Sequence, residues 1–474
     1  MHPPDPGISR RVFATSSVAV LASLAVPRHG GATPSGRAVP GLRPPANVQV
    51  TNDGFTAHIE PVVAVNPRDP AILLAACRVF TGSGIGLASY ASADAGRSWQ
   101  ANGLLPGLAP DSGGNPAVAF SRHGTGYLCG IRGTGPVPGQ LSQGDAVLWH
   151  TSGRGRPLGP PVTVIPGRGG LVDHPGIAVD PSGAAPGWIG ATAVVFGSAG
   201  QNLVFSASVD AGLTFGPPRP IDRMTGTQAN LPVIAAGPAR TVHIAYFVVT
   251  ANAGILTMVS SADHGQTFAA PVSLGSITAT EPYLGDVTIK SGPAIAASPQ
   301  STAVYAAITS YDRTTGRSQI LLFASPDAGR TWSATVTVAA STTLAYLQPQ
   351  LAVDRAGRIG LSAYAYDLAA QQITVLMFRS PPGRPAFSAP LTVSSQSFNP
   401  ALAVDFGGTH WLGNYQGLAA GPDGFQPIWT DTRTGSTQVF TATRMPVTRP
   451  ALRAAFPPGT PLEVGRSTTA VRDI

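Results

Sequence analysis

The sequence predicts an all-β fold, a β-propeller built from four-stranded blades. Two phrases that repeat in phase, and the turn residues between them, carry this prediction. Glycine and proline are abundant, at 56 and 46 of 474 residues, and they recur at regular intervals. This spacing is typical of many short strands joined by turns. Hydrophobic residues make up 43% of the chain and charged residues 11%, which is enough apolar material for a large core.

The first repeated phrase is a proline followed by alternating small and apolar residues, often ending in aspartate. Successive copies begin 51–61 residues apart, at Pro61, Pro116, Pro175, Pro232, Pro293, Pro349 and Pro400. The period is close to that of a four-stranded propeller blade. Each proline is therefore predicted to lead the first strand of a blade. Seven blades are favoured, and six are the alternative if the last repeat combines differently with the N-terminal segment.

The second phrase is Ser-x-Asp-x-Gly-x-Ser/Thr followed by Trp or Phe. Its four complete copies contain Asp94, Asp210, Asp263 and Asp327. In a hairpin turn the Ser and Asp side chains can accept backbone N–H bonds, and the glycine can adopt a positive φ. The aromatic ring is expected to pack between neighbouring blades. These four aspartates are therefore predicted to be structural.

These residues resemble the Asp-box (BNR) repeats of the sialidase-like family of secreted β-propellers, which includes exo-α-sialidase-like proteins. The closing segment, Leu412–Leu418 with Trp429–Arg433, resembles the last blade of that family. The resemblance covers roughly Asn47 to Arg444. It implies that the Asp-box turns lie away from the ligand-binding face.

The ends of the repeat array predict how the ring closes. The last repeat stops near Arg444 without a fourth strand, and Asn47–Thr51 has the pattern of that missing strand. We expect it to complete the last blade, because this pairs an otherwise open sheet edge. The predicted organisation is a signal peptide at 1–30, a flexible linker at 31–46, a propeller at 47–444 and a C-terminal tail at 445–474.

The N-terminus indicates export. Ser9-Arg10-Arg11-Val12-Phe13 resembles a twin-arginine motif, and the apolar stretch Val12–Val26 is too short to remain as a membrane span. The chain is therefore predicted to be secreted, to the cell envelope or beyond, with no integral membrane segment once the signal is removed. In an oxidising compartment Cys77 and Cys129 could form a disulfide or remain buried thiols, and the sequence leaves both open.

Charge and motifs exclude several classes of protein. The formal net charge is +7, but arginines in the first 46 residues and from Arg444 onward supply it, so the body is neutral. A nucleic-acid binder needs a concentrated basic face. The sequence has no HExxH zinc motif, P-loop or dinucleotide fingerprint. No cofactor, metal or nucleic acid is expected, and a monomer is predicted.

The resemblance implies a catalytic site at the central opening of the ring, which we call the central mouth. Sialidases use a tyrosine nucleophile, and the family pattern adds a Glu base, an Asp acid and three arginines that clamp a carboxylate. The matching candidates are Tyr283 or Tyr415 as nucleophile, Glu281 or Glu60 as base, Asp312 as acid, and Arg78, Arg132 and Arg313 as clamp. The early Arg-Ile-Pro motif of the family is missing here.

The preferred interpretation is that the central mouth binds a ligand without catalysing a reaction. Asn414 and other amide and aromatic residues at the predicted rim suit hydrogen bonding and stacking with sugars. The sequence thus predicts an exported propeller that binds a glycan or other extracellular ligand at its central mouth. The alternative is an exo-glycosidase acting on sialosides or related acidic sugars. Asp173-His174 is expected to be a turn at the entry of a blade.

Overall fold

The computed structural model describes residues 45–446, except for 83, 109–111, 136–140, 184, 198–199, 224–227, 250–253, 278, 423 and 444. The predicted signal peptide, nearly all of the linker and the tail beyond residue 446 lie outside the described residues. Within this part the protein is all-β, with no α-helix and one 3-10 turn, η1 (Pro400–Leu402). None of its helical segments has the length and hydropathy needed to cross a membrane.

The strands form consecutive four-stranded antiparallel units in chain order. The first three units are β2 (Ala57–Val65), β3 (Leu73–Phe80), β4 (Ile85–Ser92) and β5 (Gln100–Leu104); then β6 (Gly113–Phe120), β7 (Gly126–Thr134), β8 (Gln143–Thr151) and β9 (Pro157–Ile165); then β10 (Leu171–Val179), β11 (Ile189–Gly197), β12 (Gly200–Ser208) and β13 (Arg219–Arg223). The second and third units join in one eight-stranded sheet, because β10 pairs in parallel with β8.

The remaining units follow the same plan. They are β14 (Gln228–Ala236), β15 (Val242–Val249), β16 (Gly254–Ser261) and β17 (Val272–Ile277); β19 (Ala294–Ala297), β20 (Val304–Asp312), β21 (Arg317–Ser325) and β22 (Val336–Ser341); and β23 (Leu344–Val353), β24 (Ile359–Asp367), β25 (Gln372–Arg379) and β26 (Leu391–Thr392). The last sheet contains β29 (Gly417–Gly421), β30 (Gly424–Asp431), β31 (Gln438–Ala442), β32 (Met445–Pro446) and β1 (Asn47–Gln49). A small separate sheet is formed by β18 (Val287–Thr288), β27 (Val404–Asp405) and β28 (His410–Trp411).

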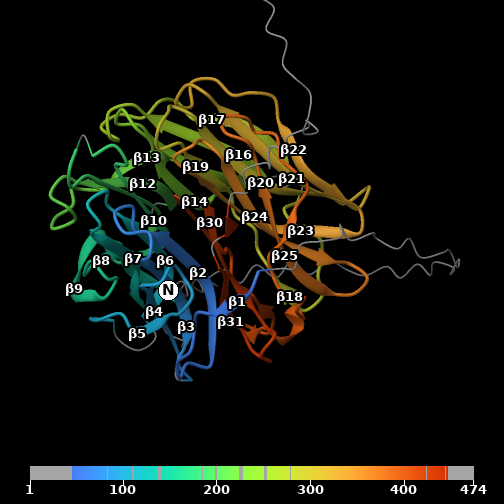
Figure 1. The fold of residues 1–474 in the computed structure, drawn as a ribbon. Helices are drawn as coiled ribbons and strands as arrows, with labels where there is room; N and C mark the ends of the chain where they lie inside the picture. Colours follow the sequence, from blue (N-terminus) through green and yellow to red (C-terminus); the bar gives the residue numbers. More distant parts are fainter. Residues whose placement is uncertain are drawn as a thin grey trace, which may run out of the picture.

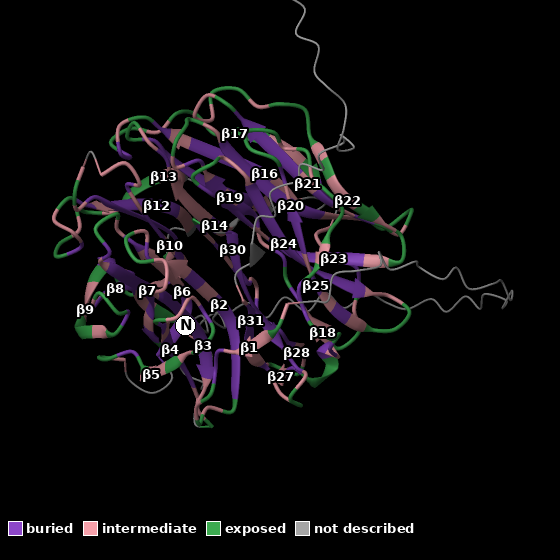
Figure 2. Cartoon of the chain, viewed as in Figure 1, coloured by how far each residue is buried: buried purple, intermediate pink, exposed green. Residues whose placement is uncertain are grey.

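The first strand of each unit lies on the inside of a ring. In chain order these inner strands contact one another, from β2 through β6, β10, β14, β19 and β23 to β29, and β29 contacts β2. Figure 1 shows the sheets arranged around a common centre, and Figure 2 shows buried strands with exposed loops at the periphery. The protein is therefore a β-propeller, and its core consists of apolar layers between neighbouring sheets.

The repeated prolines mark the inner strands in all repeats but the last. Pro61, Pro116, Pro175, Pro232 and Pro349 lie within inner strands, and Pro293 directly precedes one. The prediction for Pro400 is wrong, because that proline begins η1. The Asn399 side chain accepts the Ala401 N–H at 2.9 Å and caps this turn. The inner strand of the last unit is β29 instead.

The four Ser-x-Asp-x-Gly turns share one set of hydrogen bonds. In the first, Ser92 Oγ accepts the Gly96 N–H at 2.9 Å, and Asp94 Oδ1 accepts the Ser98 N–H at 2.9 Å. The Ser98 hydroxyl donates to Asp94 Oδ2 at 2.6 Å. Gly96 has a φ of 85°, which only glycine adopts at low cost. The same bonds recur around Asp210, Asp263 and Asp327.

These bonds predict a contribution to acid stability. The Thr331 hydroxyl and N–H lower the pKa of Asp327 to about 2. A carboxylate with a lowered folded-state pKa stabilises the fold above its unfolded value near 3.8, and this stability is lost as the pH falls towards 2. Wild type should therefore be more stable than Asp327→Asn at pH 5, and the difference should shrink on acidification. Urea unfolding midpoints between pH 2 and 5 measure it, with Thr331→Ala as an intermediate variant. A difference that stays constant with pH contradicts this role.

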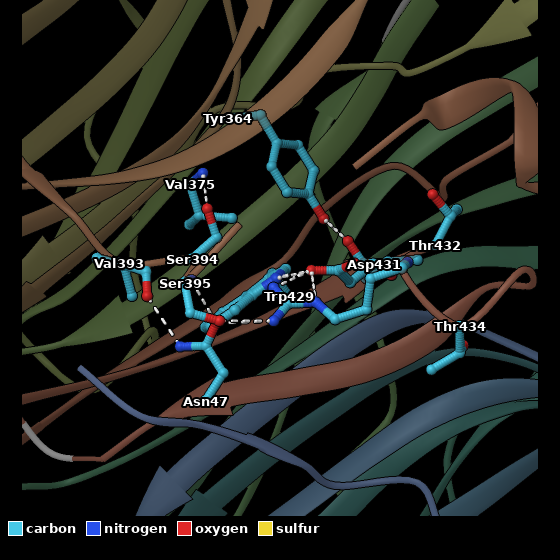
Figure 3. Close-up of polar contacts among 12 residues, drawn as sticks. Asn47, Tyr364, Val375, Val393, Ser394, Ser395, Trp429, Asp431, Thr432 and Thr434 are labelled. Atoms are coloured by element: carbon cyan, nitrogen blue, oxygen red, sulfur yellow. Dashed lines mark hydrogen bonds and ion pairs between the residues drawn. The ribbon is translucent and has the colours of Figure 1, made fainter. Parts of the chain in front are cut away.

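The N-terminal strand is tied to two sheets. Strand β1 pairs antiparallel with β31, with Asn47 opposite Ala442. The Asn47 side chain donates to the Val393 carbonyl at 2.9 Å and accepts the Ser395 N–H at 2.6 Å (Figure 3). Asn47 therefore links β1 to the segment that follows β26 in the preceding sheet.

Arg433 reinforces this link. Its Nη1 donates to Asn47 Oδ1 and Ser395 Oγ, both at 3.0 Å, and its Nη2 lies 2.6 Å from Asp431 Oδ2. The Asp431 side chain is fully buried and also accepts the Trp429 indole N–H at 2.9 Å (Figure 3). A buried ion pair thus holds the start of the described chain against its last sheet.

The two cysteines are separate, buried thiols. Cys77 lies on β3 and Cys129 on β7, and neither forms a disulfide. Burial raises the pKa of both thiols, that of Cys129 to about 12. Both therefore behave as small apolar core residues.

Candidate functional site

A cavity of about 270 Å³ lies at the centre of the ring. Each unit contributes to its wall through the inner strand or the residues just before it, including Val62, Asn115, His174, Leu231, Pro293, Gln350 and Tyr415. This volume is slightly below the roughly 300–1,000 Å³ typical of ligand pockets.

The cavity wall has a polar and an apolar side. Asn115, His174, Asn414 and Tyr415 come from neighbouring units, because β29, β2, β6 and β10 contact one another in that order. The side formed by β14 and β19 is apolar, with Leu231, Pro232, Val233, Ile234, Ala294 and Ile295. Such a wall suits a ligand that has polar edges and an apolar face.

The residues before the repeated prolines have an unusual backbone conformation. Glu60, Asn115, His174, Leu231 and Gln348 have φ values between 49° and 57°. Each lies at a register shift between its inner strand and the next strand. A positive φ is uncommon outside glycine, and a residue before proline is normally extended. Such positions cost about 1–3 kcal/mol each and cluster at functional sites, where a bulge re-aims a side chain.

Glu60 is the first of these residues and is fully buried. Burial raises the pKa of its carboxyl, although the positive charges of Arg78 and His174 oppose this. The Asn414 backbone N–H also lowers the pKa, but it falls short of full hydrogen-bond geometry with either carboxylate oxygen. Glu60 is therefore a buried acid beside two cations.

Arg78 and Tyr415 complete this buried cluster. The Arg78 guanidinium lies over the rings of Phe406 and Trp411, at 5.3 and 5.1 Å from their centres. Burial and the Glu60 carboxylate raise the pKa of Tyr415 well above its usual value, so its hydroxyl is neutral. That hydroxyl donates to the Pro116 carbonyl at 3.4 Å.

Asp173 and His174 form a second titratable pair at the cavity. His174 Nδ1 lies 3.1 Å from Asp173 Oδ2, and the Asn115 amide donates to Asp173 Oδ1 at 3.0 Å. Burial lowers the pKa of His174, but the Asp173 carboxylate outweighs it, and the net shift is upward. Burial likewise raises the pKa of Asp173, but the His174 charge and hydrogen bonds lower it overall.

Sequence reasoning interpreted Asp173-His174 as an entry turn, and the structure places His174 on the cavity wall. His174 directly precedes a repeated proline, as Glu60 does. This shared position is the feature of the sequence that indicates His174 as a site residue. The alternation of the inner strand, however, gave no indication that this position faces the channel.

The structure brings four of the predicted candidates together. Glu60 and Arg78 influence each other's pKa and that of Tyr415, and Asn414 lies within 3.4 Å of His174. Tyr283, in contrast, is 91% exposed.

The other candidates have neighbours of their own. Glu281 is next to Thr280, Lys290 and Arg313; burial raises its pKa and these groups oppose the shift. Asp312 is exposed and accepts the N–H groups of the turn that follows it. Arg132 pairs with Asp145 at 3.4 Å. Of the three proposed clamp arginines, Arg78 is therefore the one that neighbours Tyr415.

No protein-family model and no curated protein matches the sequence. Solved structures do match at low similarity. A protein of unknown function from Dyadobacter fermentans is 16% identical and matches 74% of this chain and 98% of its own, with a TM-score of 0.43. An ulvan lyase, a polysaccharide lyase, is 12% identical over 84% of this chain and 96% of its own, at 0.49. The intramolecular trans-sialidase from Ruminococcus gnavus is 14% identical over 83% and 96%, at 0.40. These similarities are too low to assign this chain a ligand or a reaction.

Proposed function

We propose that the protein binds a glycan, or another extracellular ligand of similar polarity, at its central cavity. The observation that carries this proposal is the cavity wall, to which each unit of the ring contributes. The polar side offers amide, imidazole and hydroxyl groups for hydrogen bonds. The apolar side offers aliphatic contacts for the face of a sugar ring. A ligand site usually has a mostly apolar wall with a small number of polar groups that point to the same place.

The framework belongs to the same proposal. Residues 47–444 form a monomeric propeller of seven blades, with the Ser-x-Asp-x-Gly turns as Asp-boxes, and β1 closes the ring. The pairing of β1 with β31 and the contact of β29 with β2 support this closure. Residues 1–30 are the twin-arginine signal of an exported protein, with a linker at 31–46 and a tail at 445–474. Its ligand is an extracellular glycan or glycoconjugate, not a nucleic acid.

The binding test uses isothermal titration calorimetry with a panel of soluble neutral and acidic oligosaccharides. At least one member should bind wild type, and Asn414→Ala should weaken it about tenfold, because a buried polar partner is lost. Asn202→Ala, which removes a side-chain amide on β12 outside the cavity wall, is the matched control and should bind as wild type does. Binding that is equal in wild type and Asn414→Ala, or no binding to any member, would contradict the proposal.

A second candidate is glycoside hydrolysis of the sialidase type. Tyr415 would be the nucleophile, Glu60 its base and Arg78 part of a carboxylate clamp. The closeness of Tyr415 to both Glu60 and Arg78, each of which acts on its hydroxyl, favours this candidate. A tyrosine needs a base to become nucleophilic, since its free hydroxyl is a weak nucleophile.

A further inference from the structure

We propose that His174, oriented by Asp173, is a general acid that protonates the glycosidic oxygen of a terminal neutral sugar bound in the central cavity. This inference rests on the proposed ligand site and adds a reaction to it. It uses residues other than the Tyr415 and Glu60 of the sialidase-type candidate.

The geometry of His174 fits this role. Its Nδ1 is occupied by Asp173, and its Nε2, which lies 3.4 Å from the Asn414 amide, is the nitrogen that a ligand displacing that amide would meet. Both Asp173 oxygens have partners. Oδ2 pairs with the His174 ring, and Oδ1 accepts hydrogen bonds from the His174 backbone N–H and the Asn115 side-chain amide. Asp173 is therefore a positioning residue. A carboxylate on Nδ1 fixes the tautomer and the orientation of the imidazole.

The Asn414 amide can serve His174 in both protonation states. Its Nδ2 lies 3.4 Å from His174 Nε2, and its Oδ1 is buried without a hydrogen-bond partner in the described part of the chain. With Nδ2 towards the ring, the amide donates to a neutral Nε2. Rotated by half a turn, its Oδ1 accepts the Nε2–H of the imidazolium. The Nε2 proton can therefore leave and return while the buried imidazole keeps a hydrogen-bond partner.

The charges around His174 favour a neutral ligand. Glu60 on β2 and Asp173 on β10 are balanced by Arg78 on β3 and by His174 itself, and Tyr415 is neutral. Lys290, before β19, lowers the pKa of His174, whereas Asp173 and Glu60 raise it. The charge of Lys290 is met by the Glu281 carboxyl, whose pKa it lowers, so the balance holds. The net upward shift keeps the imidazole protonated closer to neutral pH, which suits a general acid.

The reaction balances with water as the second reactant. His174 Nε2–H gives its proton to the glycosidic oxygen, and the bond between that oxygen and the anomeric carbon breaks with its electron pair on the oxygen. Water adds to the anomeric carbon and loses a proton, which returns to Nε2. One glycosidic bond and one water thus become two hydroxyl groups. Tyr415 takes no part in this reaction, because water is the nucleophile that adds to the anomeric carbon.

The test measures release of the free sugar from methyl α- and β-glycosides of neutral hexoses and pentoses between pH 5 and 8, because the methanol leaving group needs a proton; a methyl glucuronide and a methyl sialoside are the acidic comparison substrates. His174→Asn should lower kcat about 10²–10⁴-fold, the usual contribution of general acid catalysis, with little change in KM. Asparagine tolerates the positive φ at this position. The exposed His123, in the turn between β6 and β7, gives the control His123→Asn, which should keep the wild-type kcat.

Asp173→Asn separates positioning from structure. Without the carboxylate the His174 pKa should fall, so the basic limb of the kcat profile should move to lower pH. An NMR titration of the His174 imidazole should show the same shift independently of turnover. Thermal unfolding checks that each variant is folded.

Three outcomes overturn the inference. They are wild-type turnover in His174→Asn, loss of turnover in Tyr415→Phe with retention in His174→Asn, and ligand binding by wild type without cleavage of any neutral glycoside. The last outcome leaves the proposed binding function intact. Absence of both binding and cleavage refutes the proposed function itself.

Discussion

Replacing Arg433 by alanine should lower the free energy of unfolding by about 3–5 kcal/mol, the cost of leaving one partner of a buried ion pair uncompensated. The Asp431 side chain has no exposed surface, and its Oδ2 lies 2.6 Å from Arg433 Nη2. The same substitution removes the bonds from Arg433 to Asn47 and Ser395. Chemical denaturation followed by circular dichroism measures the loss.

Arg358→Ala is the matched control for this prediction. Arg358 also pairs with a buried aspartate, Asp354, at 2.6 Å, but this pair stays within the turn between β23 and β24. Both variants should lose stability. Amide exchange at Val50, which donates to the Val439 carbonyl, should accelerate in Arg433→Ala alone. Equal exchange in the two variants would show that Arg433 does not hold the N-terminal strand.

Local patterns predicted much of the fold because propeller units are built from local signals. The turn at Ser92–Ser98 depends on side chains within four residues of their partners, so its sequence is sufficient to specify it. The alternation after Pro61 or Pro175 predicts a strand because its period matches the pleat. Pro400 begins the same pattern, yet the Asn399 cap and a proline at the first helical position favour a 3-10 turn there.

The site was less predictable because it depends on backbone conformations that the sequence does not display. Residues before proline are normally extended, so nothing indicated that Glu60 and His174 would adopt positive φ values. The register shifts at these positions arise from pairing with the next strand. Residue type was enough to nominate Glu60, Arg78 and Tyr415, whereas the approach of His174, which pairs with its chain neighbour Asp173, to Asn414 240 residues away became visible only in three dimensions.

The reason for a glycine at one strand junction is likewise visible only in the structure. Gly144 lies on β8 at the point where this strand meets both Gly133 on β7 and Leu171 on β10. A Cβ on Gly144 would lie 2.7 Å from the Gly133 Cα and 2.9 Å from the Arg132 carbonyl oxygen. These contacts are backbone atoms of a paired strand, which cannot rotate away.

Gly144→Ala should therefore destabilise the protein by about 2–3 kcal/mol, the upper part of the usual cost of overpacking. The loss should be accompanied by faster exchange of the Gly144 N–H, which donates to the Gly170 carbonyl at 3.0 Å. Gly153→Ala is the control, because a Cβ there meets no atom within 4 Å and its φ is not positive. It should leave the unfolding midpoint within experimental error or raise it slightly, since alanine reduces the entropy of the unfolded chain. If both substitutions have the same effect, then close backbone contact is not the reason for glycine at position 144, and the junction between the second and third units tolerates a wider separation than the structure shows.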